Sequence, residues 1–228
     1  MEKHVNYIKL INSCSAPRQA YTGASKTPED LLTEESDTNP VSLYGRTKLK
    51  SEEALLEIAD ENFKPTILRM GTIYGYSPRL RLDLVINKLI AKSLIDKSLI
   101  LHGGNQWRPN VHIQDVCDFY LRCIESSVDV IGSQIFNLGS FEQNYQIRTI
   151  ESVIVDEIRS RIDLETMDGE IFEDSRNYKL DFSKIESVLK FKATHTIHDA
   201  ISEFTYEIEH NNLESYSNPI YYNHEYLK

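Results

Sequence analysis

Cysteine and long apolar runs are both scarce in this 228-residue chain. Its three cysteines, Cys14, Cys117 and Cys123, are too few and too scattered for a disulfide framework or a zinc site, so we expect no metal centre. No apolar run approaches the roughly 20 residues that a membrane-spanning helix needs. The first residues also lack the apolar segment of a secretory signal. These absences predict a soluble protein of the reducing cytoplasm, without a membrane partner.

Positive charge and glycine are also in short supply. The chain carries 25 lysines and arginines against 35 acidic residues, a formal net charge of −10, and no basic run stands out. Nucleic acid is therefore disfavoured as a partner. The nine glycines include no G-x-G-x-x-G, the loop that cradles the phosphates of a dinucleotide. We expect the isolated chain to bind a dinucleotide poorly, because the backbone N–H groups of such a loop and helix are missing.

Segments of strand character alternate with segments of helical character along the chain. Expected strands cover residues 5–12, 65–70, 99–101, 111–113, 134–138 and 178–181. Expected helices cover residues 40–59, 82–95, 114–126, 148–162, 183–189 and 197–210. This alternation predicts an α/β fold, with the C-terminal part of a Rossmann-like doubly wound parallel sheet and a smaller α/β substrate-binding cap.

The chain divides into three parts on this interpretation. Residues 1–75 form a partial Rossmann-like catalytic segment, residues 76–214 form mainly the cap with some returning Rossmann elements, and residues 215–228 form a tail. The long polar loop at residues 13–40 belongs to the first part, and loops of this length inside a domain are usually functional.

Tyr44 and Lys48 are the most informative residue pair in the sequence. Four residues apart on the expected helix, they share one face, so the ammonium can lie beside the phenol. A nearby positive charge stabilises the phenolate and makes the tyrosine a better base. Tyrosine and lysine also recur at this spacing by chance on many helices, so the pair alone is a weak signal. Ser13 or Ser15, where the first strand ends, could bind the same substrate oxygen, or could simply start a turn.

Several sequence blocks, taken in order, resemble one family. They are residues 11–15 (INSCS), 40–48 (PVSLYGRTK), 68–75 (LRMGTIYG), 103–116 (GGNQWRPNVHIQDV), 136–139 (FNLG) and 174–178 (DSRNY). Together they resemble the NAD-dependent nucleotide-sugar epimerase/dehydratase family, within the extended short-chain dehydrogenase/reductase superfamily. The resemblance covers residues 5–210, and the N-terminal part of the Rossmann domain has no counterpart in this chain.

The resemblance implies catalytic roles and a cofactor. Ser13 falls at the catalytic serine or threonine, although the residues after it make Ser15 an open alternative. Tyr44 matches the acid/base, and Lys48 matches its partner, which in the family also holds the nicotinamide ribose. The implied cofactor is NAD.

The resemblance also implies a nucleoside diphosphate sugar as ligand. Arg108 matches the arginine that clamps the diphosphate, a task that suits its forked donors. Asn87, Asn137 and Arg176 are further candidate contacts, with ordinary polar surface as the alternative. We expect a structural role for Asp115, as the N-cap of the helix that follows it, and for His112 packed beneath it.

Three kinds of role remain open at this point: an enzyme, a remnant or subunit that binds nucleotide sugars, and a structural partner in a dimer. The residues next to Ser13 include no acid, which argues against a dehydratase and favours an epimerase, with a 4-keto-sugar reductase equally compatible. A chain without the dinucleotide loop could instead be a non-catalytic remnant that binds nucleotide sugars, or a subunit completed by an N-terminal chain. A homodimer through the apolar stripe of the catalytic helix, Leu49, Ala54, Leu55 and Ile58, is the third expectation.

Overall fold

The computed structural model describes residues 10–11 (backbone only), 30–170, 177–210, 213, 215 and 217–223. The strands are β1 (Leu10–Ile11), β2 (Leu31–Leu32), β3 (Thr66–Met70), β4 (Thr72–Tyr74), β5 (Ser98–Leu101), β6 (Trp107–His112), β7 (Ile135–Leu138), β8 (Asn144–Gln146), β9 (Glu165–Asp168) and β10 (Lys179–Leu180). The α-helices are α2 (Leu43–Glu57), α3 (Val85–Asp96), α4 (Ile113–Glu125), α5 (Val128–Ile131), α6 (Ile147–Arg159), α7 (Ser183–Leu189) and α8 (Ile197–Glu209). Short 3-10 helices cover Phe141–Gln143 and Pro219–Tyr221.

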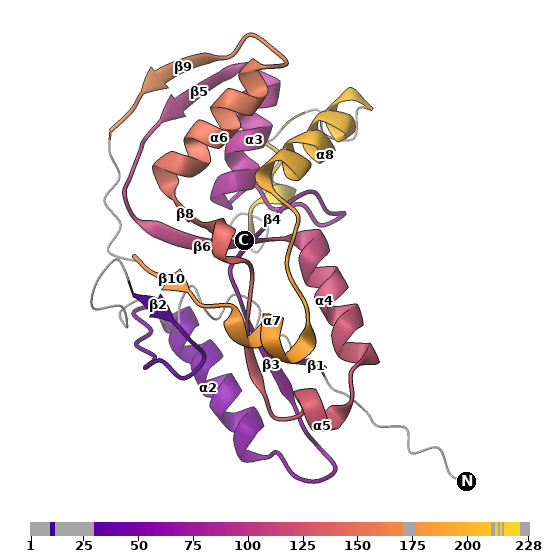
Figure 1. The fold of residues 1–228 in the computed structure, drawn as a ribbon. Coiled ribbons are helices and arrows are strands. Elements are labelled where there is room, and N and C mark those ends of the chain that lie inside the picture. Colours follow the sequence, from indigo (N-terminus) through magenta and orange to yellow (C-terminus); the bar gives the residue numbers. More distant parts are fainter. Residues whose placement is uncertain are drawn as a thin grey trace.

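The first sheet is parallel and runs in the order β1-β3-β7. Its central strand β3 is buried along its whole length, Arg69 included, as expected for a strand covered on both faces. Helices α2, α4 and α7 surround this sheet (Figure 1). Leu68, Met70, Phe119, Phe136 and Phe182 form the centre of its core. This arrangement confirms the predicted α/β class with a parallel sheet.

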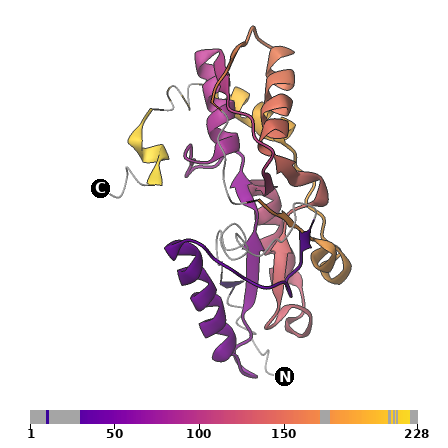
Figure 2. The ribbon, with the colours of Figure 1, turned by 90° about the vertical axis from the view of Figure 1, so that its left-hand side faces the viewer.

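A second group of elements lies beyond the end of β3. After Gly71 the chain continues as β4, which pairs in parallel with β6, while β6 pairs antiparallel with β8. A Cβ on Gly71 would lie 3.0 Å from the Asn110 backbone, so glycine permits this close approach. Helices α3, α6 and α8 pack around one apolar core, and α2 lies at the opposite end of the molecule (Figures 1 and 2). Among the described residues, none of the helices combines the length and the apolarity needed to cross a membrane.

Several local predictions need correction. Residues 107–112 form one six-residue strand instead of a minimal strand at 111–113. Asp115 is not the N-cap of α4: the Nδ1 atom of His112 caps it by accepting from Gln114 N–H at 3.2 Å. Residues 72–74, expected as a turn, form strand β4, and strands β2, β8 and β9 and helix α5 were not predicted. Strand β2, for example, is two residues long and exists through pairing with β10, about 150 residues away, which no local pattern can indicate.

Candidate functional site

Tyr44 and Lys48 lie on the same face of the first turns of α2. The helix begins after Ser42, whose hydroxyl accepts the Gly45 N–H at 3.0 Å. This cap places Tyr44 at the second helical position, where its side chain is 43% exposed. The Lys48 Nζ atom lies 5.5 Å from the centre of the Tyr44 ring, within cation–π range. The predicted pairing of ammonium and phenol is therefore present.

A buried ion pair fastens α2 to the first sheet. Glu52, on α2, and Arg69, on β3, are each 3% exposed, and both carboxylate oxygens accept from the guanidinium, with Nε to Oε2 at 3.1 Å. The third donor of Arg69, Nη1, reaches the Glu34 carbonyl oxygen at 3.0 Å. The Glu34 carboxylate in turn accepts the Asn137 N–H at 2.7 Å, and burial raises the pKa of Glu34. Polar contacts thus set the position of the helix that carries Tyr44.

A pocket of about 360 Å³ opens between α3, α6 and the strands β5 and β6. Its apolar wall comes from both helices and from β5. The apolar residues are Val85, Leu89, Leu99, Ile100, Ile147 and Ile150. Its polar residues are Thr72, Lys88, Lys92, His102, Gly103, Gln106, Arg108, Asn110 and Glu151. An apolar cleft with a few converging polar groups is typical of a small-molecule site.

Positive charge dominates the ionisable groups of this pocket. Arg108 is 5% exposed and donates from Nη1 to the Trp107 carbonyl oxygen at 2.7 Å. Lys88 and Lys92 add two ammonium groups from one face of α3. Glu151 is the one acidic residue among the described residues that line the pocket. The pocket therefore suits an anionic ligand with an apolar or aromatic part.

The other predicted site residues lie elsewhere. Neither Asn87 nor Asn137 occurs among the described residues that line the pocket. The Asn87 side chain accepts the Gly75 N–H at 2.9 Å and donates to the Arg81 carbonyl oxygen at 3.0 Å, which ties the start of α3 to the end of β4. Asn137 is fully buried and donates to the carbonyl oxygens of Leu32 and Asp181, each at 3.2 Å.

Two further candidates, Ser13 and Arg176, lie outside the described residues, as does the alternative Ser15.

The structure also reveals lining residues that sequence interpretation missed. Lys88 and Lys92 could have been found from their spacing of four on an expected helix. Glu151 carried no such signal, because a lone acid on an amphipathic helix normally faces solvent.

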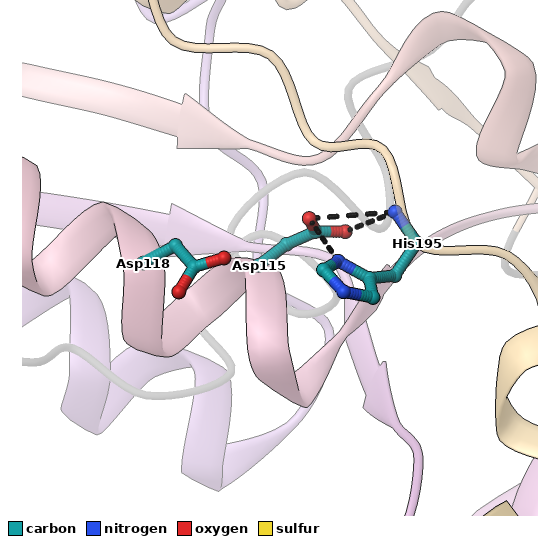
Figure 3. Close-up of side chains that lie close together, drawn as sticks. All are labelled: Asp115, Asp118 and His195. Carbon is teal, nitrogen blue, oxygen red and sulfur yellow. Dashed lines mark hydrogen bonds and ion pairs between the residues drawn. The ribbon is translucent and has the colours of Figure 1, made fainter.

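A separate polar cluster joins α4 to the segment before α8. The Asp115 carboxylate, 2% exposed, accepts the Thr194 N–H at 3.0 Å and the His195 N–H at 3.1 Å, and it receives His195 Nδ1–H at 2.8 Å (Figure 3). Asp118 lies next to this pair, and the potential ligand atoms of the three residues lie within 4.8 Å of one another. Because the Asp115 oxygens already serve main-chain and imidazole donors, the cluster acts as a structural joint.

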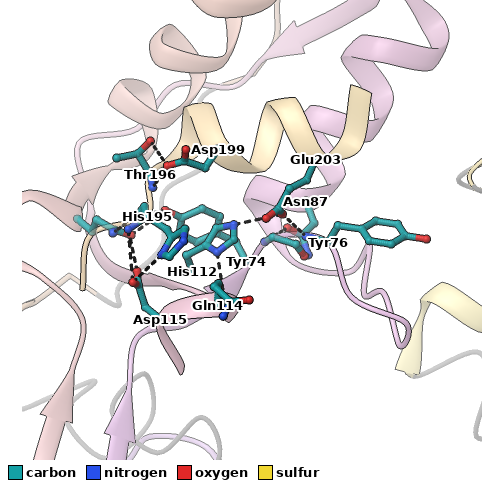
Figure 4. Close-up of polar contacts among 12 residues, drawn as sticks. Tyr74, Tyr76, Asn87, His112, Gln114, Asp115, His195, Thr196, Asp199 and Glu203 are labelled. Carbon is teal, nitrogen blue, oxygen red and sulfur yellow. Dashed lines mark hydrogen bonds and ion pairs between the residues drawn. The ribbon is translucent and has the colours of Figure 1, made fainter. Parts of the chain in front are cut away.

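His112 connects this joint to helix α8. Its ring stacks on that of His195, with centroids 5.1 Å apart, and its Nε2 atom lies 3.3 Å from Glu203 Oε2 (Figure 4). Glu203, on α8, also accepts the Tyr76 N–H at 3.0 Å. A Cβ on Gly75, at φ 105°, would lie 2.6 Å from the same Nε2 atom. The chain leaving β4 is thus held between β6 and α8, and the expected structural role of His112 agrees with this geometry.

The joint shifts the pKa values of its members. Burial alone would lower the pKa of His195, but the hydrogen bond and charge of Asp115, with Asp199 and Asp118 nearby, raise it overall. Burial alone would raise the pKa of Glu203, but hydrogen bonds from His112 and the Tyr76 N–H lower it overall. Both shifts favour the charged forms of a carboxylate–imidazole joint.

Comparison with known sequences points to one family. The sequence model of the NAD dependent epimerase/dehydratase family matches residues 4–139. Among characterised proteins, the beta subunit of methionine adenosyltransferase 2 from Bos taurus is 35% identical over 83 residues, which are 36% of this chain and 24% of that protein.

Solved structures share the fold. MoeE5 in complex with UDP-glucose and NAD is 24% identical, with a TM-score of 0.68 over 89% of this chain and 65% of its own. The UDP-glucuronic acid 4-epimerase from Bacillus cereus, in complex with UDP-glucuronic acid and NAD, is 26% identical, with a TM-score of 0.65 over 84% of this chain and 60% of its own. The predicted Rossmann-like class is confirmed, and this chain spans less than two thirds of the length of these neighbours.

Proposed function

Because the chain belongs to the NAD dependent epimerase/dehydratase family, we propose that it supplies the catalytic and substrate-binding residues for hydride transfer at a carbon of a nucleoside diphosphate sugar. The observation that carries this proposal is the Tyr44–Lys48 pair. It lies inside the matched region, at an exposed helix face, with the ammonium 5.5 Å from the centre of the phenol ring. A phenol arranged in this way can exchange a proton with a sugar hydroxyl.

The pocket supports the proposed ligand class. Arg108 offers a planar set of donors suited to a diphosphate, and Lys88 and Lys92 add charge for the same anionic group. The apolar wall from α3, β5 and α6 suits a nucleoside. The Bacillus cereus neighbour is described with UDP-glucuronic acid bound, which makes a uridine diphosphate sugar the first ligand to test.

The residues present fit part of NAD. The Tyr44 hydroxyl and the Lys48 ammonium are donors suited to the ribose next to the nicotinamide. The dinucleotide phosphates need backbone N–H groups at the start of a helix, and the sequence contains no glycine-rich loop that would supply them. When bound, NAD accepts the hydride from the sugar carbon. We propose that Tyr44 and Lys48 hold the nicotinamide half and that residues outside these 228 hold the rest.

The proposed proton chemistry depends on three side chains. Tyr44 takes the proton from the sugar hydroxyl as the carbon is oxidised and gives it back on reduction. Lys48 stabilises the phenolate through its positive charge. Ser13, with Ser15 as the alternative, hydrogen-bonds the same substrate oxygen. Because Arg108 holds the diphosphate, the sugar attached to it stays at a fixed distance from Tyr44.

Epimerase is the preferred reaction, with 4-keto-sugar reductase as the alternative. Cys14, Ser15 and Ala16 next to Ser13 include no carboxylate for a dehydration step. The two reactions differ in redox balance: an epimerase returns the hydride to the sugar and consumes no NADH, whereas a reductase oxidises one NADH per turnover. A linked absorbance assay for NADH therefore separates them.

Two alternatives to turnover by this chain alone are also proposed. It could be one subunit of a split enzyme, or a remnant that binds nucleotide sugars without turnover. A homodimer through the stripe of Leu49, Ala54, Leu55 and Ile58 also stays proposed; Ile58, the C-cap of α2, is 63% exposed, and Leu43 at the start of the helix is 73% exposed. Light scattering of the purified chain, alone and with the product of any adjacent upstream gene, distinguishes these assemblies.

The test of the proposed function is calorimetric titration with UDP, UDP-glucose and NAD. We expect the chain to bind UDP and UDP-glucose. Arg108→Ala should weaken both by roughly 10- to 100-fold, since a bond to a charged group contributes about 1.5–3 kcal/mol, and Arg108→Lys should recover part of this. If the parent chain binds neither ligand, the proposal fails. Sugar binding without NAD binding under any pairing supports the remnant.

The remaining predicted ligand contacts need the same assay. Asn87, Asn137 and Arg176 stay proposed contacts of the diphosphate, and Asn87 and Asn137 also bond the main chain. Titrating UDP into the three single alanine variants, each checked for its melting temperature, separates a ligand contact from a purely structural role. A true contact lowers affinity in a variant whose fold is intact.

A further inference from the structure

The loop between β5 and β6 forms one wall of the pocket and is attached to α6 at several points. His102, Gly103 and Gln106, all in this loop, line the pocket. Gly103 and Gly104 have positive φ angles, 64° and 128°, which gives the loop its sharp turn. The first backbone N–H groups of α6, at Ile147 and Arg148, donate to the carbonyl oxygens of Gln106 at 3.3 Å and Gly104 at 3.1 Å.

Glu151 completes this attachment one turn further along α6. Its Oε1 atom accepts the His102 N–H at 3.0 Å, and its Oε2 atom accepts the Gly103 N–H at 2.9 Å. The side chain is 5% exposed, so both bonds are charge-assisted and shielded from water. Glu151 shares the pocket lining with three cationic residues, Lys88, Lys92 and Arg108.

We propose that Glu151 is a positioning residue for ligand binding: it fixes the His102–Gly103 turn in the shape that receives the nucleoside diphosphate. This inference rests on the proposed function, because it assigns a role within the same pocket. The turn is held in place before the ligand arrives, so binding does not have to order it. Glu151 acts through the main chain of the loop and is not itself a catalytic residue.

Two substitutions separate position from charge. Glu151→Gln removes the charge, and its amide can accept only one of the two N–H groups. Glu151→Asp keeps the charge, but its carboxylate is one methylene too short to reach both. If Glu151 positions the turn, both variants bind UDP about tenfold more weakly, equal to about 1.4 kcal/mol. If its charge alone matters, Glu151→Asp binds as the parent does and Glu151→Gln binds more tightly, which would overturn the proposal.

The matched control is Glu157→Gln. Glu157 lies on the same helix, pairs with Arg161 at 2.6 Å and is outside the pocket. The Glu157→Gln substitution should leave the UDP affinity unchanged. Amide hydrogen exchange provides a second readout: residues 102 and 103 should exchange faster in both Glu151 variants, while the core of α6 stays protected. Unchanged exchange at these amides would contradict the proposal that Glu151 holds the His102–Gly103 turn in place.

The outcomes are distinct from those that test the function. A parent chain that fails to bind UDP overturns the proposed function and the ligand role of Glu151 with it. A parent chain that binds UDP, with Glu151 variants that bind equally well, overturns the positioning role alone.

Discussion

Helices α2 and α6 carry the two halves of the candidate site, and they pack against the rest of the protein in different ways. Helix α6 buries an apolar face, Ile150, Ile154, Val155 and Ile158, together with Glu151. Helix α2 buries only Gly45 and Glu52. The pocket wall is therefore held by apolar packing along a whole helix face, whereas the Tyr44–Lys48 helix has a buried ion pair at Glu52 and only half-buried leucines, Leu49, Leu55 and Leu56.

The difference bears on function. A wall that is packed from behind keeps its shape without a ligand, which lowers the cost of binding. A helix whose Tyr44 face is exposed is accessible to the remaining NAD-binding residues that we propose. The contrast to test is between a pocket wall packed along a whole helix face and an exposed helix that carries the proposed acid/base.

The largest expected effect is on turnover. In a preparation that turns over a nucleoside diphosphate sugar, Tyr44→Phe should lower kcat by about 10²–10⁴-fold, because it removes the acid/base group. UDP affinity should stay the same, since Tyr44 is not among the described residues of the pocket wall. Initial rates and calorimetry measure the two effects. An unchanged kcat would remove Tyr44 from the mechanism.

The attachment of α2 is the next test. Glu52→Leu leaves the Arg69 guanidinium buried without its carboxylate and should lower the free energy of unfolding by about 3–5 kcal/mol. Adding Arg69→Met should recover much of this loss, because no unpaired charge then remains buried. Urea denaturation of the two variants measures the difference. A loss below about 1 kcal/mol for Glu52→Leu would mean that packing, and not the ion pair, holds α2.

The cationic wall of the pocket should have a smaller effect. Lys88→Gln and Lys92→Gln should each weaken UDP binding by about two- to fivefold, as expected for partly exposed charges worth up to about 1 kcal/mol. The loss should shrink as salt is added, because salt screens such charges. Lys50→Gln is the control, since Lys50 is exposed on α2 away from the pocket. A uniform loss in all three variants would point to net charge and not to the pocket.

The smallest expected effect concerns the joint between the two regions. The pKa of His195 is raised above its ordinary 6.5, so its pairing with Asp115 stabilises the fold below that pH. This contribution is lost as the pH rises through the raised value. The carboxylates of Asp118, Asp199 and Glu203 and the ring of His112 also face the joint.

The measurement is thermal unfolding of the parent and of His195→Gln between pH 5.5 and 8.5. The difference in stability should be largest at the acidic end and should shrink toward pH 8.5. The control is His198, an exposed histidine on α8: the melting temperature of His198→Gln should follow that of the parent across the range. A difference that grows with pH would contradict the sign of the shift.

Much of the fold was predictable from local pattern. Strands at residues 65–70 and 134–138 and the long helices were correctly expected, because apolar runs and helical periodicity report burial directly. The strand expected at 178–181 is present as β10, but its partner β2 was not expected, since two residues form a strand only where a distant partner lies alongside. The N-cap of α4 was assigned to Asp115 instead of His112, because the sequence does not tell which polar residue is turned toward the helix and which toward a neighbouring segment.

The candidate site divides in the same way. The Tyr44–Lys48 face was determined by the sequence alone, because a spacing of four on a capped helix brings two side chains together whatever the rest of the chain does. The pocket was decided only by the tertiary structure. Arg108, Lys88 and Glu151 come from three elements up to 63 residues apart, and Glu151 acquires its role only when the 102–103 turn is folded against α6. Burial and main-chain partners of that kind arise from long-range packing, which local sequence does not encode.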